Sequence, residues 1–143
     1  MRKSELMTLW NVESWSVEPY GVYFVSRRLG TNCLENVGQA FQKLNISCTN
    51  YTEAEVLSLP LWEQLYTQLD ELDQLAQELI QKEIPQEESV VLTLTDIMLD
   101  KSGCYDAFAL GYDIGESPAG HLYVLVSFDE NFIAQQDVIY ETL

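Results

Sequence analysis

The side chains most open to a chemical interpretation are four closely spaced aspartates, Asp96, Asp100, Asp106 and Asp113. Carboxylates in such a group can ligate a metal ion or act as the acid and base of a glycosidase. These four fall at the ends of expected strands and in turns, where aspartate is common for conformational reasons. We therefore expect a solvated acidic rim, with no catalytic residue, no metal site and no cofactor.

The thiols and the sole imidazole give no stronger signal of catalysis. Cys33, Cys48 and Cys104 are widely spaced without a CxxC pair, and His121 opens an apolar run. Neither pattern has zinc-ligand spacing, and a nucleophilic pair of Cys104 with His121 lacks any flanking motif. The sequence also contains no phosphate-binding loop, dinucleotide fingerprint, HExxH or GxSxG motif. We expect reduced, structural cysteines and a protein that is not an enzyme.

The elements that would position these residues begin with a β-hairpin at 9–26, whose turn lies at 18–21. Apolar residues spaced by three and four then predict a helix at about 33–44. Its apolar stripe is Leu34, Val37, Phe41 and Leu44. A capping box of Thr52 and Glu55 predicts a short helical turn after it.

A long amphipathic helix is predicted from about residue 58 to Pro85. Its apolar seam follows heptad spacing at Trp62, Leu65, Leu69, Leu72, Ala76 and Leu79. Its outer face is acidic and consists of Glu63, Asp70, Glu71, Asp73, Glu78 and Glu83, with Lys82. We expect the seam to pack on a sheet, with a coiled-coil dimer as the alternative.

The remaining sequence predicts four strands, at 89–96, 104–113, 121–128 and 132–140, with 115–120 as a loop and 129–131 as a tight turn. Short connections favour an antiparallel meander. The expected fold class is α+β in a single domain, 1–143. It consists of an N-terminal β-hairpin, two or three helices, and a four-stranded antiparallel meander packed against the helices.

Charge restricts the classes of partner. The 143 residues carry a formal charge of −16 at pH 7, and it is uneven: residues 1–43 sum to +1 and residues 44–143 to −17. Such a surface repels phosphate backbones and anionic lipids, so we expect no direct nucleic-acid or membrane contact. A basic protein is the partner that this charge attracts. Without a transmembrane stretch or a signal peptide, we expect a cytoplasmic location.

Acidic residues interleaved with tyrosines in the C-terminal half form the predicted partner-binding surface, because charge speeds encounter and aromatic anchors slow dissociation. The predicted residues are Asp96, Asp100, Tyr105, Asp106, Tyr112, Asp113, Glu116, Asp129 and Glu130.

The general build, with the segments 109–113 (ALGYD) and 121–129 (HLYVLVSFD) near its end, resembles the immunity proteins of bacterial polymorphic toxin and contact-dependent growth inhibition systems. These are small, often acidic α/β proteins that neutralise a cognate toxin. The resemblance implies an antitoxin whose partner is a toxin domain, commonly a DNase or RNase with a basic cleft. It also implies a monomer or weak dimer.

Two other classes remain as alternatives. A type III secretion chaperone is similarly small and acidic and binds an extended effector segment as a dimer, but such chaperones usually begin with a helix and not with a hairpin. An acidic DNA mimic would inhibit nucleic-acid-binding proteins by imitating phosphates with carboxylates.

Overall fold

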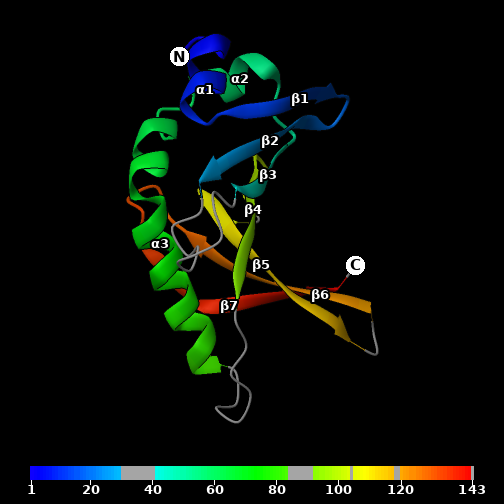
Figure 1. The fold of residues 1–143 in the computed structure, drawn as a ribbon, viewed down its shortest axis with the longest axis vertical. Coiled ribbons are helices and arrows are strands. Elements are labelled where there is room, and N and C mark those ends of the chain that lie inside the picture. The colour runs from blue at the N-terminus through cyan, green and yellow to red at the C-terminus, as the bar shows by residue number, and fades with distance from the viewer. Residues whose placement is uncertain (30–40, 84–91, 104, 118–119, 143) are drawn as a thin grey trace.

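The computed structural model describes residues 1–29, 41–83, 92–103, 105–117 and 120–142, which form one seven-stranded sheet with three helices (Figure 1). The helices are α1 (Lys3–Leu9), α2 (Glu53–Ser58) and α3 (Trp62–Glu83). The strands are β1 (Val12–Glu18), β2 (Gly21–Leu29), β3 (Phe41–Thr49), β4 (Thr93–Asp100), β5 (Phe108–Ser117), β6 (Gly120–Phe128) and β7 (Ala134–Thr142).

The strands lie in the sheet in chain order, with β1 at one edge and β7 at the other. Neighbouring strands are antiparallel except β3 and β4, which are parallel and place Asn45 beside Asp96. Parallel neighbours require a crossover connection, and the chain between β3 and β4 contains α2 and α3. The β3–β4 pair therefore joins two antiparallel blocks, β1–β3 and β4–β7, into one mixed sheet.

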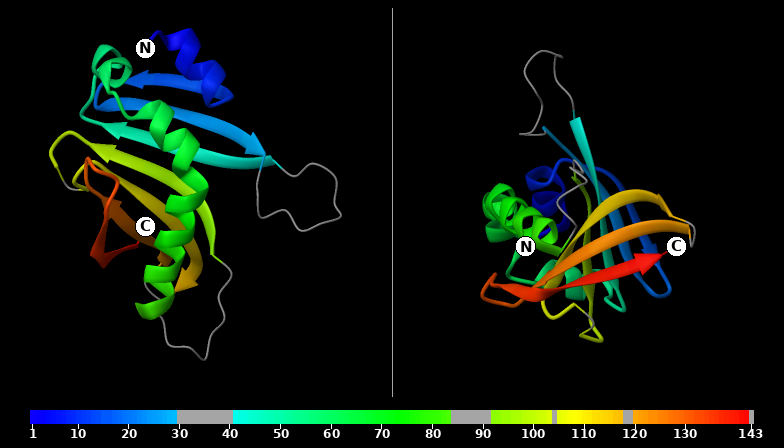
Figure 2. Two further views of the ribbon diagram at one scale, coloured as in Figure 1. Left: turned by 90° about the vertical axis from the view of Figure 1, so that its left-hand side faces the viewer. Right: turned by 90° about the horizontal axis from the view of Figure 1, so that it is seen from below.

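All three helices lie on the same side of this sheet: α3 runs across one face, and α1 and α2 lie near its β1–β2 end (Figures 1 and 2). Strand residues alternate between the two faces. We call the side that faces the helices the helix-covered face, and it carries buried Phe24, Ile46, Leu110 and Val126. The opposite side, which no helix of the described residues covers, is called the open face.

Two tryptophans connect the helices to this core. Trp62, at the start of α3, is 1% exposed and donates its indole N–H to the Val56 carbonyl of α2 at 2.8 Å. Its ring lies edge-on to Trp10, which follows α1, at 6.2 Å and to Phe24 of β2 at 5.7 Å. This aromatic cluster fixes all three helices against the hairpin.

The predicted arrangement of the strands is wrong. The hairpin is not a separate N-terminal unit, because β1 and β2 belong to the same sheet as the four C-terminal strands. Those four strands do pair antiparallel in chain order, but within a mixed seven-stranded sheet and not as a four-stranded meander on helices. The strand missing from the prediction is β3, whose first residues fall in the helix predicted at about 33–44 and whose remaining residues were assigned to no element.

The helix predicted at 33–44 lies partly in residues 33–40, outside the described residues, and its end is wrong. Leu44 lies in β3 and points to the core together with Ile46 and Cys48, so the apolar period there is two and not three to four. Helix α1 was not predicted, and the expected loop at 115–120 contains the end of β5 and the start of β6. The described strands also begin later than expected: β4 at Thr93 and β5 at Phe108.

Other elements were predicted correctly. The hairpin pairs Trp15 with Phe24 across β1 and β2. The Thr52–Glu55 capping box opens α2, and the predicted α3 seam is buried from Trp62 to Ala76. The regular helical spacing of that seam was a strong enough signal to be read without tertiary information.

Candidate partner-binding surface

The open face carries an acidic cluster at the centre of the sheet, on β4, β5 and β6. Asp96 neighbours Asn45 of β3, and Asp113 pairs with Tyr123 of β6. Asp96, Asp113 and Tyr123 each precede or follow a core residue in their own strand. Alternation therefore directs their side chains away from the helices. We call Asp96, Asp113 and Tyr123 the Asp96 cluster.

The members of the Asp96 cluster influence one another electrostatically. Burial of the Asp96 carboxyl raises its pKa, the negative charge of Asp113 raises it further, and hydrogen bonds from Thr95 (2.7 Å) and Asn45 oppose the rise. The pKa of Tyr123 is also raised, first by desolvation and then by the two carboxylates. Desolvation is the larger cause of both shifts, and the neighbouring carboxylates add to it, so a positive group at this place on the sheet would find a favourable potential.

Regular alternation after Leu110 and Tyr112 directs Asp113 to this face, whereas Asp96 reaches it through irregular pairing. The register shifts between Leu94 and Asp96 in β4, and a second shift in β5, between Asp113 and Gly115, follows Asp113. Gly111 of β5 pairs with Asp96 of β4. A Cβ at this glycine would stand 2.9 Å from Cδ2 of Leu125 and 3.1 Å from Cβ of Asp96. The close approach explains the glycine, while the bulges could not be predicted from the sequence because they depend on strand pairing.

Asp100, another predicted surface residue, has a local structural role. Its carboxylate accepts hydrogen bonds from the Ser102 backbone N–H at 2.9 Å, the Ser102 hydroxyl at 2.8 Å and the Asn50 amide at 3.1 Å. These contacts fix the turn after β4 and connect it to the end of β3, so conformational reasons account for this aspartate.

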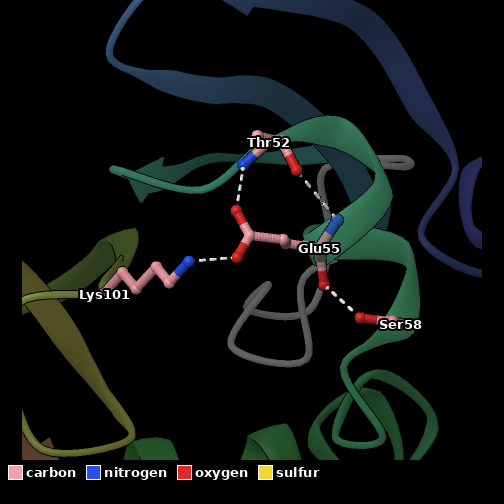
Figure 3. Close-up of polar contacts among 4 residues, drawn as sticks. All are labelled: Thr52, Glu55, Ser58 and Lys101. Carbon is pink, nitrogen blue, oxygen red and sulfur yellow. Dashed lines mark hydrogen bonds and ion pairs between the residues drawn. The ribbon is translucent and has the colours of Figure 1, made fainter.

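The neighbouring Lys101 extends that connection to α2, as Figure 3 shows. Its ammonium group pairs with the Glu55 carboxylate, which also accepts the Thr52 backbone N–H at 3.0 Å. The Lys101 contact, followed by the Thr52 bond, lowers the pKa of Glu55. Lys101, one of the two bases in residues 44–143, is therefore paired with an acid of the same chain.

Three predicted residues lie at the end of the sheet where β5 begins and β6 ends. Asp106 is exposed with a φ of 59°, and Glu130 is exposed in the β6–β7 turn. Asp129 accepts the backbone N–H groups of Asn131 at 2.8 Å and Ile133 at 3.0 Å, which shapes that turn. The structure therefore separates these three from Asp113, which lies toward the other end of β5.

The assignment of Tyr112 to the surface is wrong. Its side chain is fully buried on the helix-covered face, and its hydroxyl donates to the Asp73 carboxylate of α3 at 2.5 Å. Burial, reinforced by that carboxylate, raises the pKa of Tyr112 far above its usual range. Asp73, which the sequence assigned to the outer face of the helix, is thus an internal partner, and the helical spacing gave no signal of this.

The two remaining predicted residues differ in how far the structure describes them. Glu116 pairs with His121 across β5 and β6, but the side chains of both lie outside the described residues. Tyr105 is half-buried and donates its hydroxyl to the Glu141 carboxylate of β7 at 3.0 Å.

The outer face of α3 is a second acidic surface. Glu63, Asp70, Glu71 and Glu78 are exposed there, and Leu75 is 47% exposed between the last two. The side chain of Glu83 lies outside the described residues.

The described residues contain no group of three or more potential metal ligands. Cys48 is a buried thiol whose desolvation raises its pKa to about 12, as expected of a structural residue. Cys33 and Cys104 lie outside the described residues. Within the described helices, none has the length and apolar character required to cross a membrane.

Comparison with known proteins gives no relative: no family, no curated protein and no solved structure matches this chain.

Proposed function

We propose that this chain is a binding protein that occupies and blocks a basic surface of a partner protein, in the manner of a toxin-neutralising immunity protein. One observation carries the proposal: most of its negative charge has no basic counterpart within the chain. Lys3 pairs with Glu53 at 3.6 Å, Lys43 pairs with Glu13 at 3.2 Å, and Lys101 pairs with Glu55. Residues 44–143 contain 19 acids and only one further base, Lys82.

An excess of this size exceeds what a small domain needs for solubility and costs self-repulsion. A nuclease binds its substrate through Lys and Arg side chains that neutralise phosphates. Carboxylates presented on a rigid sheet can occupy the same side chains. The Asp96 cluster supports this proposal because it combines two carboxylates with an aromatic ring on the open face.

The test is capture of the partner on tagged protein in a lysate of the organism of origin, washed at low and at high salt. One stoichiometric protein with a basic nuclease-like domain, retained at high salt, is the expected result. Many nucleic-acid-binding proteins lost together as salt rises would contradict the proposal and indicate a DNA mimic instead.

Two matched baits show which acidic surface is used. Asp96→Asn with Asp113→Asn removes both carboxylate charges of the Asp96 cluster, and Glu71→Gln with Glu78→Gln removes the same charge from α3. If the open face binds, the first bait loses the partner at lower salt than the second. Equal loss would mean that only the total charge matters, which would remove the Asp96 cluster from the proposal.

The chaperone alternative gains from one observation. The sequence argument against it was an N-terminal hairpin without a preceding helix, and α1 precedes the hairpin. Capture of a partner only in its unfolded state, by a dimer of this chain, would favour the chaperone. A folded partner bound by a monomer would favour the immunity protein.

A further inference from the structure

The two edges of the sheet differ in how their outer backbone groups are protected. An exposed edge strand presents unpaired N–H and C=O groups on which another strand can form. β1, at one edge, is short, contains a register shift between Val12 and Ser14, and carries Glu13 and Glu18.

Side chains from α1 and α2 also hold β1 in place. The Trp15 indole N–H donates to Glu53 of α2 at 2.8 Å, and the Lys3 ammonium lies 5.2 Å from the centroid of the same indole. This edge is therefore bent, charged and supported by helices.

β7, at the other edge, is nine residues long and has no strand on its outer side among the described residues (Figure 2). After the irregularity opposite 126–128, residues 138–142 pair regularly with β6. This stretch begins with Val138, Ile139 and Tyr140, the residue types that favour strands. Tyr140 is 51% exposed, so a large aromatic surface lies beside the open backbone.

We propose that β7 accepts an extended basic segment of the partner protein as an eighth strand. The inference rests on the proposed function and adds where and how the partner binds. Backbone hydrogen bonds along 138–142 would give affinity, and side chains of the added strand would pack beside Tyr140.

Charge selects a basic segment over a second copy of this chain. Asp137, which is exposed, and Glu141 flank the apolar stretch, and Tyr105 holds the Glu141 carboxylate in place. Pairing of β7 with another β7 would bring these acids together between two chains that each carry −16. Lysines or arginines on an added strand would instead meet them as opposite charges across the ladder, which is favourable.

The test uses a short synthetic peptide of alternating lysine and valine, with a peptide of alternating glutamate and valine as its control. Hydrogen exchange of the full chain is followed by NMR with and without peptide, and affinity is measured by fluorescence anisotropy. We expect the lysine peptide to protect amides within 138–142 and to leave β1 unchanged. The glutamate peptide is expected not to bind.

Two variants with the same change in charge test whether peptide binding depends on charge at the β7 edge or on the net charge of the whole molecule. Asp137→Lys is expected to weaken binding of the lysine peptide by about fivefold, since a favourable exposed ion pair becomes a repulsive one. Glu18→Lys lies on β1, six strand spacings away, far beyond the screening length of roughly 8 Å at physiological salt. We expect it to leave the affinity unchanged.

The edge proposal would be overturned if both variants weakened peptide affinity equally, or if the peptide protected amides of other strands in place of those in β7. Either result would still be compatible with a basic partner protein. Dimerisation of the chain alone, with protection of 138–142 that rises with protein concentration, would also overturn the edge proposal in favour of a second copy. Edge binding of the peptide without any basic partner in the capture experiment would instead refute the proposed function alone.

Discussion

On the helix-covered face of the sheet, Phe24, Leu110 and Tyr112 are sealed under α3 and its neighbours, whereas the open face holds the two carboxylates and the tyrosine of the Asp96 cluster. The same strands build both faces, because neighbouring residues point to opposite sides. On the first face the hydroxyl of buried Tyr112 has its partner inside the chain, the Asp73 carboxylate of α3, whereas the buried indole N–H of Trp10 has no partner among the described residues.

This difference indicates where stability and recognition reside. Apolar burial dominates the free energy of folding, so substitutions on the helix-covered face should mainly unfold the protein. Carboxylates that lie close together on the open face contribute unfavourable repulsion to folding. Their substitution should therefore affect partner binding more than stability.

The largest effect is expected at the aromatic cluster of the helix-covered face. Trp62→Ala removes an indole that contacts Trp10 and Phe24 and leaves the Val56 carbonyl without its donor. We expect it to lower the free energy of unfolding by about 3–5 kcal/mol, measured by urea denaturation. Tyr123→Ala, the open-face control, should cost less than about 1 kcal/mol; similar losses for both would contradict the comparison.

Gly111→Ala tests a point where the open face is tightly packed, beside buried Leu125. The added methyl would lie 2.9 Å from Cδ2 of Leu125 and 3.1 Å from Cβ of Asp96, so the Leu125 side chain or strand β4 must shift. Overpacking of this kind costs about 1–3 kcal/mol. Unchanged stability in the same denaturation assay would show that the Leu125 side chain and β4 give way without cost.

Tyr112→Phe removes only the hydroxyl that bonds to Asp73 across the boundary between sheet and helix. The Asp73 carboxylate keeps the Gln77 amide as a donor at 3.0 Å, so one hydrogen bond is lost and we expect a loss of about 1 kcal/mol. Tyr66→Phe is the matched control, since the ring keeps its contact with Trp10 at 5.1 Å. A loss no greater than in the control would mean that water replaces the hydroxyl.

The sequence revealed those parts of the fold that local spacing determines. The heptad seam of α3 and the Thr52 cap of α2 are local patterns, and both were predicted. β3 was missed because the spacing up to Leu44 fits a helix, whereas the alternation of Leu44, Ile46 and Cys48 is short and interrupted by polar residues. Its parallel pairing with β4 is a contact between distant segments, which local periodicity does not encode.

The candidate surface was predictable only as a set of residue types. Asp96 and Asp113 were both selected, but their proximity depends on the pairing of β4 with β5 and on the register shift between Leu94 and Asp96. Tyr112 was misassigned because a tyrosine in a strand is equally common on either face. Its partner Asp73 lies on a helix 39 positions away in the sequence.

The smallest expected effect is a pair of opposite pH dependences. The pKa of Asp96 is raised above its ordinary 3.8 mainly by burial, so the folded protein binds this proton more tightly than the unfolded chain does. The stability it contributes is therefore present below pH 3.8 and is lost as pH rises through the folded pKa. Asp96→Asn should raise Tm at pH 7, and the difference should disappear in acid.

Glu55 should show the reverse dependence. Its pKa is lowered below the ordinary 4.5 mainly by Lys101, so its stabilisation is present above pH 4.5 and is lost as pH falls through the folded pKa. Glu55→Gln should lower Tm at pH 7 by an amount that shrinks in acid. Thermal melts of both variants between pH 3 and 8 check the signs, and the same sign for both would contradict the assignment.

Neutralisation of a basic partner protein by this acidic chain can be measured directly. The most direct measurement is a titration of the purified, captured partner with the chain, in which the partner's cleavage of nucleic acid is followed at physiological salt. We expect activity to fall to background at one equivalent of chain and a high salt concentration to slow formation of the complex. Full activity with saturating chain bound would contradict neutralisation, because the chain would then be a binding protein that inhibits nothing.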